Sequence, residues 1–446
     1  MDAFKTHEQV ISNYRSYLSS FLNIADERIK EEVKRAFDSD GFIPEPLIQF
    51  NPSFEKGNSL NDLPVNAALS KAFGAYNLYK HQYEAIQIGI QNKGFVVTSG
   101  TGSGKSLTYL ATIFNSIFNQ GKNKKKGVKA ILVYPMNALI NSQEEEIKKY
   151  ADNYGPDFPI TFAKYTGQEG TDIREKIKDE ASDIILTNYM MLELIMTRQS
   201  ESWLRDSIKN NLQYLVFDEL HTYRGRQGSD VSMLVRRIKS WCNNDLSCIG
   251  TSATMASAGN PDEKKEAVAK VATTIFGTKY GIDQIIREYL DTCTSGKQFN
   301  AIELRNALIK GIDETADERE FINHPVTNWI ELNIALQLNN GVLERGKPKT
   351  FKNIAQQLKD ITELDLRPIE TCLIALLKWA EKLNEKNRMA NTGFSFLPFR
   401  FHQFISQTST VSVTLQSRDI RNITIQSGLY FKDDKGEKLL YPILFS

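Results

Sequence analysis

A glycine-rich stretch, "TSGTGSGKSL" at residues 98–107, constrains the fold more than any other feature of this 446-residue chain. The apolar run "GFVV" precedes it and the apolar-periodic run "TYLATIFNSIF" follows it. The pattern predicts a buried strand, a tight turn and a helix. Backbone N–H groups in such a turn point inward, and the positive end of the helix dipole adds to their pull on anions. The stretch therefore predicts an anion site.

The spacing within this stretch fits the phosphates of a nucleotide. Lys105 would reach the β- and γ-phosphates, and Ser106 would place its hydroxyl on Mg²⁺. Ser99 stands where the pattern G-x4-G-K-[ST] has its first glycine, so the match is incomplete. The candidate nucleotide-binding residues of the turn are Thr101, Gly102, Ser103, Gly104, Lys105 and Ser106.

An acidic pair ends a second apolar run, "YLVFDELH". Asp218 could hold Mg²⁺ directly or through water, and Glu219 could polarise an attacking water. Such a pair is also common in a solvated loop, and its place downstream of the glycine-rich turn favours catalysis. We therefore expect ATP and Mg²⁺ as cofactors, with Lys105, Asp218 and Glu219 as the catalytic residues.

Residues 76 to about 280 alternate short apolar runs with helical segments, which predicts an α/β domain with a mostly parallel sheet and helices on both faces. The expected strands are "FVVTS", "AILVYP", "ITFAKYTG", "DIILTN", "YLVFDE" and "SCIGTSAT". We place this domain at 61–280, after a helical N-terminal appendage and linker at 1–60. A helical accessory insert at 281–392 and a β-rich segment at 393–446 follow. The helix pair at 350–383 could form a winged-helix-like DNA-binding insert or could simply pack.

Composition excludes several classes of protein. The formal net charge is +1, so any nucleic-acid contact depends on local positive charge. No apolar run approaches the ~20 residues that span a bilayer, and the N-terminus lacks the layout of a secretory signal. The four cysteines are scattered without a C-x2-C pair. We expect a cytoplasmic protein with reduced thiols and no membrane partner.

Five motifs in order make the chain resemble the superfamily 2 helicases of the DEAD/DEAH-box type. They are "LYKHQ", "SGTGSGKS", "YPMNALINSQ", "DELH" and "TSAT". The resemblance implies a RecA-like P-loop domain in which Gln82 reads adenine and Pro135 and Asn137 meet the nucleic-acid backbone. It also implies that His221 helps couple ATP to nucleic acid. The residues that would link ATP state to the second half of the motor are Thr251, Ser252, Ala253 and Thr254.

Two weaker motifs and one flank narrow the resemblance. "YTG" and "LTNYMML" resemble further strand-contacting loops, which makes Gly167, Thr187 and Asn188 candidate nucleic-acid contacts. The flank "DELHTYRGRQGSDVSMLVRRI" is similar to the Lhr/MrfA-like branch of DNA helicases and to large helicases of bacterial defence systems such as DISARM and Druantia. The arginines of this flank could face DNA or form the polar side of a helix.

The departures from the family matter as well. Met136 and Asn137 stand where the family often has Thr-Arg, and nothing after residue 256 resembles motifs IV to VI. Those motifs build the second RecA-like domain and carry its arginine finger. The chain ends inside the apolar run "KLLYPILFS", so we expect truncation before that domain.

The sequence predicts the N-terminal motor half of an ATP-dependent DNA helicase or translocase. It would couple Mg-ATP hydrolysis to movement on single-stranded DNA, in anti-phage defence or DNA repair, with a second RecA-like domain and defence or repair proteins as partners. Two alternatives stay open. One is a translocase on RNA or duplex DNA that does not unwind, and the other is an ATP-gated nucleic-acid-binding module that does not hydrolyse ATP.

Overall fold

The chain forms two compact units in a computed structural model. The structure describes residues 3–20, 24, 26–37, 43–74, 77–100, 102–253, 260–390, 394–405, 411–417, 419–424, 428–433 and 436–443. The central unit comprises 54–291 and 338–343, and the flanking unit comprises 1–53, 292–337 and 344–446. The central unit is therefore inserted, in sequence, within the flanking one.

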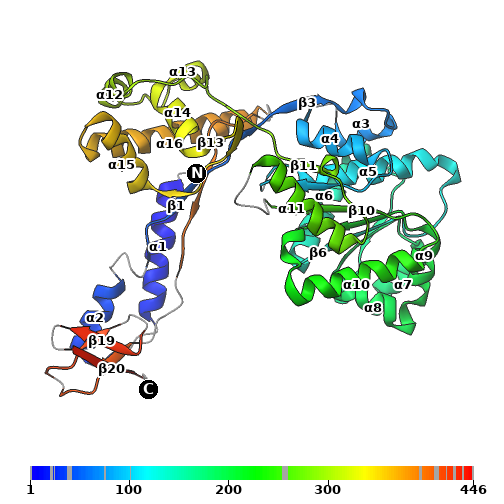
Figure 1. The fold of residues 1–446 in the computed structure, drawn as a ribbon, viewed down its shortest axis with the longest axis horizontal. Helices are drawn as coiled ribbons and strands as arrows, with labels where there is room; N and C mark the ends of the chain where they lie inside the picture. The colour runs from blue at the N-terminus through cyan, green and yellow to red at the C-terminus, as the bar shows by residue number, and fades with distance from the viewer. Residues whose placement is uncertain are drawn as a thin grey trace. The chain divides into compact units, whose positions relative to one another are not determined.

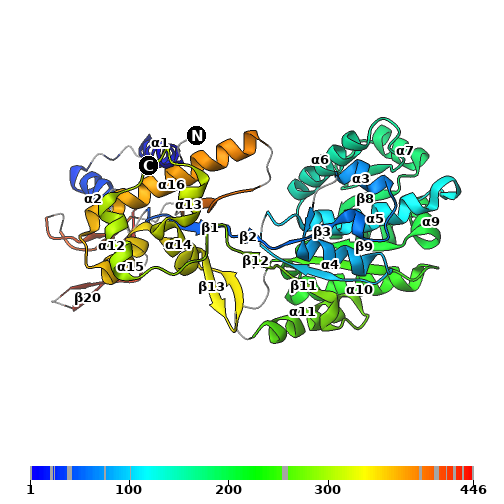
Figure 2. The ribbon, with the colours of Figure 1, turned by 90° about the horizontal axis from the view of Figure 1, so that it is seen from above.

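The central unit is built on a seven-stranded parallel sheet in the order β11-β5-β10-β9-β6-β8-β7. Helices lie on both faces of this sheet (Figures 1 and 2). The expected α/β fold class, with a parallel sheet covered by helices on both faces, is confirmed. The strands are β5 Val96–Thr98, β6 Ala130–Tyr134, β7 Phe162–Lys164, β8 Ile184–Asn188, β9 Tyr214–Phe217, β10 Ser247–Ser252 and β11 Ile285–Arg287.

Alternation along the strands divides the core into two layers. In β6, Ala130 and Leu132 pack with α3 to α6, whereas Ile131 and Val133 pack with α8 to α11. Successive side chains of a strand point to opposite faces of the sheet, so a strand that is apolar at every position must be covered on both faces. The helices supply this cover. These helices are α3 Ala68–Phe73, α4 Lys80–Gly89, α5 Lys105–Gln120, α6 Asn137–Tyr154, α7 Thr171–Glu180, α8 Tyr189–Thr197, α9 Ser202–Asn211, α10 Gly225–Trp241 and α11 Pro261–Phe276.

The sheet differs from expectation at one edge. All six expected strands are present, but β11 adds a seventh beyond the boundary placed at residue 280, pairing Ile285 with Val96. β11 is three residues long, too short to show a periodicity of its own. Four further short strands of this region are β2 Ser53–Phe54, β3 Lys56–Ser59, β4 Asn77–Tyr79 and β12 Leu290–Asp291.

The flanking unit joins segments that lie far apart in the sequence. Its three-stranded sheet has the order β15-β1-β16, so β1 (Leu47–Phe50), from the stretch expected to be a linker, is the central strand. The helices are α1 Ala3–Ser20, α2 Glu27–Phe37, α12 Ala301–Lys310, α13 Glu318–Asn323, α14 Pro325–Ile330, α15 Phe351–Thr362 and α16 Leu366–Met389. The remaining strands are β13 Leu336–Asn339, β14 Val342–Arg345, β15 Lys349–Thr350, β16 Phe399–His402, β17 Ser412–Thr414, β18 Ile423–Thr424, β19 Tyr430–Asp433 and β20 Gly436–Pro442.

Two further expectations bear on the chain as a whole. The thiols of Cys242, Cys248, Cys293 and Cys372 are free, and all but that of Cys242 are buried. Among the described residues, no helix combines the length and the apolar character that crossing a membrane requires.

Candidate ATP site and nucleic-acid edge

The glycine-rich turn joins β5 to α5 at the carboxyl edge of the sheet. Gly102 and Gly104 have φ of +82° and +68°, conformations that glycine adopts without steric cost. Ser99, the departure from the usual pattern, is fully buried, and its hydroxyl hydrogen-bonds that of Ser103 at 2.6 Å. Its side chain therefore ties the two ends of the turn together. The predicted contact Thr101 lies outside the described residues.

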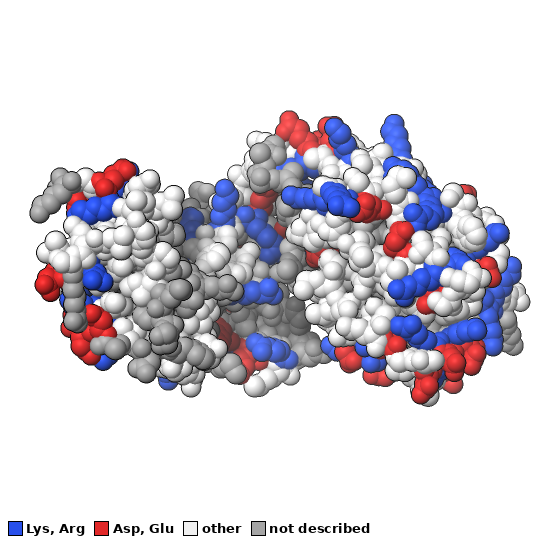
Figure 3. Space-filling model, turned by 90° about the horizontal axis from the view of Figure 1, so that it is seen from below, with Lys and Arg blue, Asp and Glu red and all other residues white. Residues whose placement is uncertain are grey.

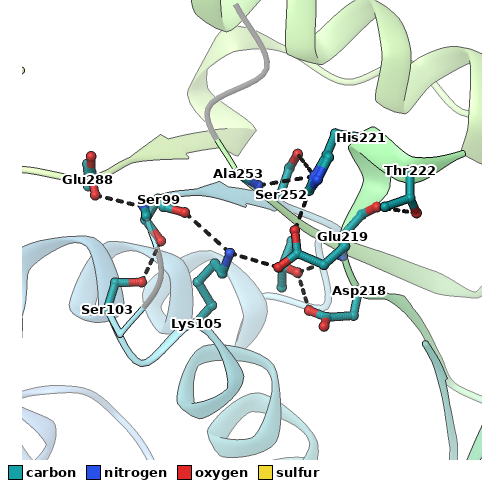
Figure 4. A network of polar contacts seen from close by, with 12 residues as sticks. Ser99, Ser103, Lys105, Asp218, Glu219, His221, Thr222, Ser252, Ala253 and Glu288 are labelled. Carbon is teal, nitrogen blue, oxygen red and sulfur yellow. Dashed lines mark hydrogen bonds and ion pairs between the residues drawn. The ribbon is translucent and has the colours of Figure 1, made fainter. Parts of the chain in front are cut away.

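Lys105 opens α5 and points across the site at the acidic pair (Figure 4). Its Nζ lies 3.3 Å from Glu219 Oε1 and 3.3 Å from the carbonyl oxygen of Ser99. Both side chains of the ion pair are partly buried, with 11% and 23% exposed. The lysine is thus held where a nucleotide phosphate would replace the carboxylate as its partner.

Asp218 directly follows β9, and its carboxyl is largely buried. Burial raises its pKa to about 6, although a hydrogen bond from the Thr251 hydroxyl lowers it and the charge of Glu219 raises it further. A divalent cation beside this carboxylate would stabilise its charged form. Ser106 lies next to Lys105 in the first turn of α5.

The donor set fits Mg²⁺ held mainly by a nucleotide. Among the described residues, no group of three or more His, Cys, Asp or Glu side chains could hold a metal ion. Mg²⁺ commonly takes one or two protein oxygens together with substrate phosphates and water. Asp218 and Ser106 would be those protein ligands, and the metal would supply charge neutralisation at the phosphates.

Glu219 has an unusual backbone for a residue with a side chain. Its φ of +54° and ψ of +55° are left-handed, which costs on the order of 1 kcal/mol outside glycine and is concentrated at functional sites. Its Oε2 lies 3.1 Å from Nδ1 of His221. The carboxylate therefore lies between a lysine and a histidine.

Residues of the "TSAT" motif hold the acidic pair. Thr251 donates its hydroxyl hydrogen to Asp218 Oδ1 and accepts the backbone N–H of Glu219 at 3.2 Å. Ser252 Oγ and Ala253 N lie 3.3 and 3.4 Å from His221 Nδ1. The structure thus brings Thr251, Ser252 and Ala253 against the "DELH" residues, whereas Thr254 lies outside the described residues. Their coupling role stays a prediction.

Gln82 braces the phosphate loop. Its Nε2 donates to the carbonyl oxygens of Ser103 and Gly104 at 3.1 and 3.2 Å, and its Oε1 accepts the N–H of Tyr79. The side chain is buried, so an adenine contact requires the amide to exchange one of these partners. His81 Nε2 also lies 3.0 Å from the Ser103 oxygen, a support that the sequence reading missed.

Glu288 is a second residue that sequence reasoning missed. It follows β11 and accepts the N–H of Gly100 on Oε2 at 2.9 Å, while its own N–H donates to the Thr98 oxygen. The signal that could have found it is the strand β11, which places the next residue beside the start of the phosphate loop.

The predicted nucleic-acid contacts gather at the carboxyl ends of β6, β8 and β7. Asn188 Nδ2 donates to Asn137 Oδ1 at 2.9 Å, and Pro135 lies partly exposed just before α6. Gly167 is exposed with φ +89°. Thr187, which was expected to contact nucleic acid, is fully buried. Its hydroxyl donates to the carbonyl oxygen of Tyr165, so its side chain joins β8 to the segment after β7.

Charged side chains of both signs are mixed on the surface of the molecule. Figure 3 shows Lys and Arg interspersed with Asp and Glu on the face drawn, in line with the net charge of +1. Arg236 donates to the oxygens of Ser232 and Thr274, and Arg237 pairs with Glu193. These two arginines of α10 are therefore engaged in packing and ion pairing.

Comparison with known proteins agrees with the geometry. The DEAD/DEAH box helicase family matches residues 79–261. Over 208 residues the chain is 37% identical to the uncharacterized ATP-dependent helicase YprA of Bacillus subtilis, covering 46% of this chain and 26% of that one. It is 24% identical over 375 residues to the Druantia protein DruE of Escherichia coli, covering 56% and 20%. A crystal structure of the DUF1998 helicase MrfA bound to DNA aligns with TM-score 0.43 and 26% identity over 58% of this chain and 32% of that one.

The chain spans about a quarter or less of the length of these two curated relatives. The predicted resemblance to Druantia proteins is confirmed by this relative. The residues that match the family also contain the ordered motifs. The phosphate loop and the acidic pair in these residues lie at one edge of the same sheet. Residues 79–261 therefore match a DEAD/DEAH box helicase domain, the type found in superfamily 2 ATPases and helicases.

Proposed function

We propose that this chain provides the first RecA-like domain of a DNA helicase or translocase that couples Mg-ATP hydrolysis to movement along single-stranded DNA. The observation that carries the proposal is the polar network at the sheet edge. There Lys105 pairs with Glu219, and one threonine, Thr251, binds both Asp218 and Glu219. In this network the lysine that would bind phosphate contacts the expected base, and the expected base and metal ligand share one threonine. Such shared contacts suit a site in which side chains change partners when ATP binds.

Each side chain has a distinct task in this proposal. Lys105 would leave Glu219 for the β- and γ-phosphates, and the freed carboxylate would orient and deprotonate the attacking water. The side-chain amides of Asn137, just after β6, and of Asn188, at the end of β8, would hold the phosphates of one DNA strand together with the exposed turn after β7. A grip on phosphates predicts strong salt dependence and little sequence preference.

Substrate and pathway are the finer part of the proposal. Single-stranded DNA is favoured because the sequence following "DELH" resembles DNA helicases. A role in anti-phage defence is supported by the similarity to a Druantia protein. The second RecA-like domain, which would contribute an arginine finger, and protein partners from defence or repair belong to the same proposal.

The test is nucleotide binding and turnover by this chain, measured with and without single-stranded DNA, RNA and duplex DNA. We expect Lys105→Ala to weaken Mg-ATP binding at least ~10-fold, because a charge-assisted contact to phosphate is lost. Lys93→Ala, an exposed lysine of the same unit, is the matched control. Mg-ATP binding that is indifferent to Lys105 would overturn the proposal. Stimulation by RNA or duplex DNA alone would replace the substrate.

A further inference from the structure

The turn after β7 holds an internal anion. The carboxylate of Glu169 accepts the backbone N–H groups of Thr166 and Gly167 at 2.8 and 2.9 Å, and the Thr166 hydroxyl at 2.7 Å. Burial of Glu169 raises its pKa, but these hydrogen bonds outweigh burial, and the pKa lies below the ordinary value. Three donors therefore converge on one ionised group.

This arrangement of donors suits a phosphate as well as a carboxylate. Successive N–H groups beside a residue of positive φ form a concave anion site, and Gly167 supplies that residue with φ +89°. A tetrahedral phosphate presents oxygens at hydrogen-bonding distance to the same three donors. The donors thus recognise an anion of either source, and the protein fills them with its own.

The turn lies on the edge where the other candidate contacts gather. β7 pairs with β8, which ends at Asn188, and a side-chain carbon on Gly167 would lie 3.4 Å from Met191 of α8. Arg174 of α7 donates to the Gly167 carbonyl oxygen at 3.1 Å, and its Nε is buried without a hydrogen-bond partner among the described side chains. A cationic group with spare donor capacity therefore adjoins the turn.

We propose that Glu169 is an internal competitor for a backbone phosphate of the nucleic acid. It occupies the three donors of Thr166 and Gly167 until a phosphate displaces it. The proposal rests on the proposed function, since it concerns the same strand-holding edge. Binding at this turn exchanges one anion for another, so Glu169 lowers affinity and favours release of the strand.

The experiment measures binding of fluorescently labelled oligo(dT) by anisotropy, for the wild-type chain, Glu169→Ala and Glu169→Gln. Glu175→Ala is the matched control because Glu175 is exposed on α7 and carries the same charge. We expect Glu169→Ala to tighten binding about 3- to 10-fold, because the freed donors gain a charged partner. The amide of Glu169→Gln accepts fewer N–H groups and should give a smaller gain. Mg-ATP binding verifies the fold of each variant.

Thr166→Val separates competition from loop structure. On the wild-type background it removes a donor that Glu169 already occupies and should change DNA binding little. On the Glu169→Ala background the same donor faces the phosphate, so the gain should be largely lost. This non-additivity is the signature of displacement.

The outcomes divide cleanly. Tighter binding by Glu169→Ala, with Glu175→Ala like wild type, supports the inference. Equal or weaker binding by both Glu169 variants, while wild type binds, overturns it and leaves the proposed function standing. Equal tightening by Glu175→Ala reduces the effect to general charge and also overturns it. No binding by any of the proteins overturns the proposed function as well.

Discussion

Two groups of polar side chains lie along the same carboxyl edge of the central sheet, and they have different kinds of partner when no ligand is bound. Beside β5, β9 and β10, opposite charges pair, as Lys105 does with Glu219. Beside β6, β8 and β7, amides pair with each other, and Glu169 sits on backbone donors. Buried polar groups require partners at both places.

The difference determines which existing contact of the protein each ligand has to displace. At the first group a phosphate would take Lys105 away from Glu219, and the freed carboxylate would turn to the attacking water. At the second group a phosphate replaces a carboxylate on the same donors. We therefore expect ATP binding to be controlled by charge rearrangement, and strand binding by competition.

Glu219→Gln should separate the two groups most strongly. The amide preserves shape but cannot accept a proton, so we expect kcat for ATP hydrolysis to fall about 10²- to 10⁴-fold. Mg-ATP affinity should hold or rise, because Lys105 loses its competing partner. Steady-state hydrolysis and oligo(dT) binding measured together check this. A parallel loss of DNA affinity would break the comparison by showing that one group serves both ligands.

Thr251→Val tests the support beneath the acidic pair. Valine keeps the volume but leaves Asp218 without its donor and the Glu219 N–H without its acceptor. A buried polar group without a partner costs about 1–3 kcal/mol, so we expect roughly a 10-fold loss of Mg-ATP affinity and a lower Tm. Thr251→Ser, which keeps the hydroxyl, is the control. Calorimetric titration of both variants decides, and similar affinities for the two would remove Thr251 from the account.

Acid should affect the two groups unequally. Because the pKa of Asp218 is raised to about 6, this carboxyl is protonated below that pH, where an ordinary aspartate stays charged. Its favourable contribution to folding is accordingly present at low pH and lost as pH rises through about 6. A protonated carboxyl is a poor metal ligand, so Mg²⁺-dependent ATP affinity should fall between pH 7.5 and 5. The lowered pKa of Glu169 predicts no change from that group in this range. Titrations with ATP, with and without Mg²⁺, measure the difference.

The smallest effect is expected at Asn137. Asn137→Ala removes the acceptor of the Asn188 amide and should weaken oligo(dT) binding only about 2- to 5-fold, the worth of one ordinary hydrogen bond. Asn137→Asp keeps that acceptor but adds a charge that repels phosphate, so it should weaken binding more. A purely structural role gives the opposite ranking. Anisotropy measured at two salt concentrations distinguishes the two rankings.

The sequence predicts the centre of this molecule better than its margins. The glycine-rich turn and the acidic pair were found because each has a fixed chemical spacing and follows an apolar strand. Most of the predicted ATP-site residues do lie together, and Thr251 touches the acidic pair directly. Local sequence pattern is enough to predict a site when its residues follow neighbouring strands of one sheet.

Contacts made through long-range pairing could not be predicted. Glu288 reaches Gly100 only because a three-residue strand pairs with β5, and no motif marks Glu169 as the partner of its own turn. Thr187 was predicted from resemblance as a contact, yet alternation along β8 turns its side chain into the core. Strand β1 has no signal of its own because both of its partners lie about 300 to 350 residues later.

That central strand has a consequence for synthesis of the chain. β1 leaves the ribosome early, but β16, with which it pairs over four residues, follows about 350 residues later. At a translation rate of about 5–20 residues per second, the strand waits for tens of seconds with its edges unpaired. The central unit is complete in sequence, apart from 338–343, well before then. The nascent protein therefore passes through a stage in which most of the central unit has been synthesised while β1 still has open edges, which are a template for aggregation.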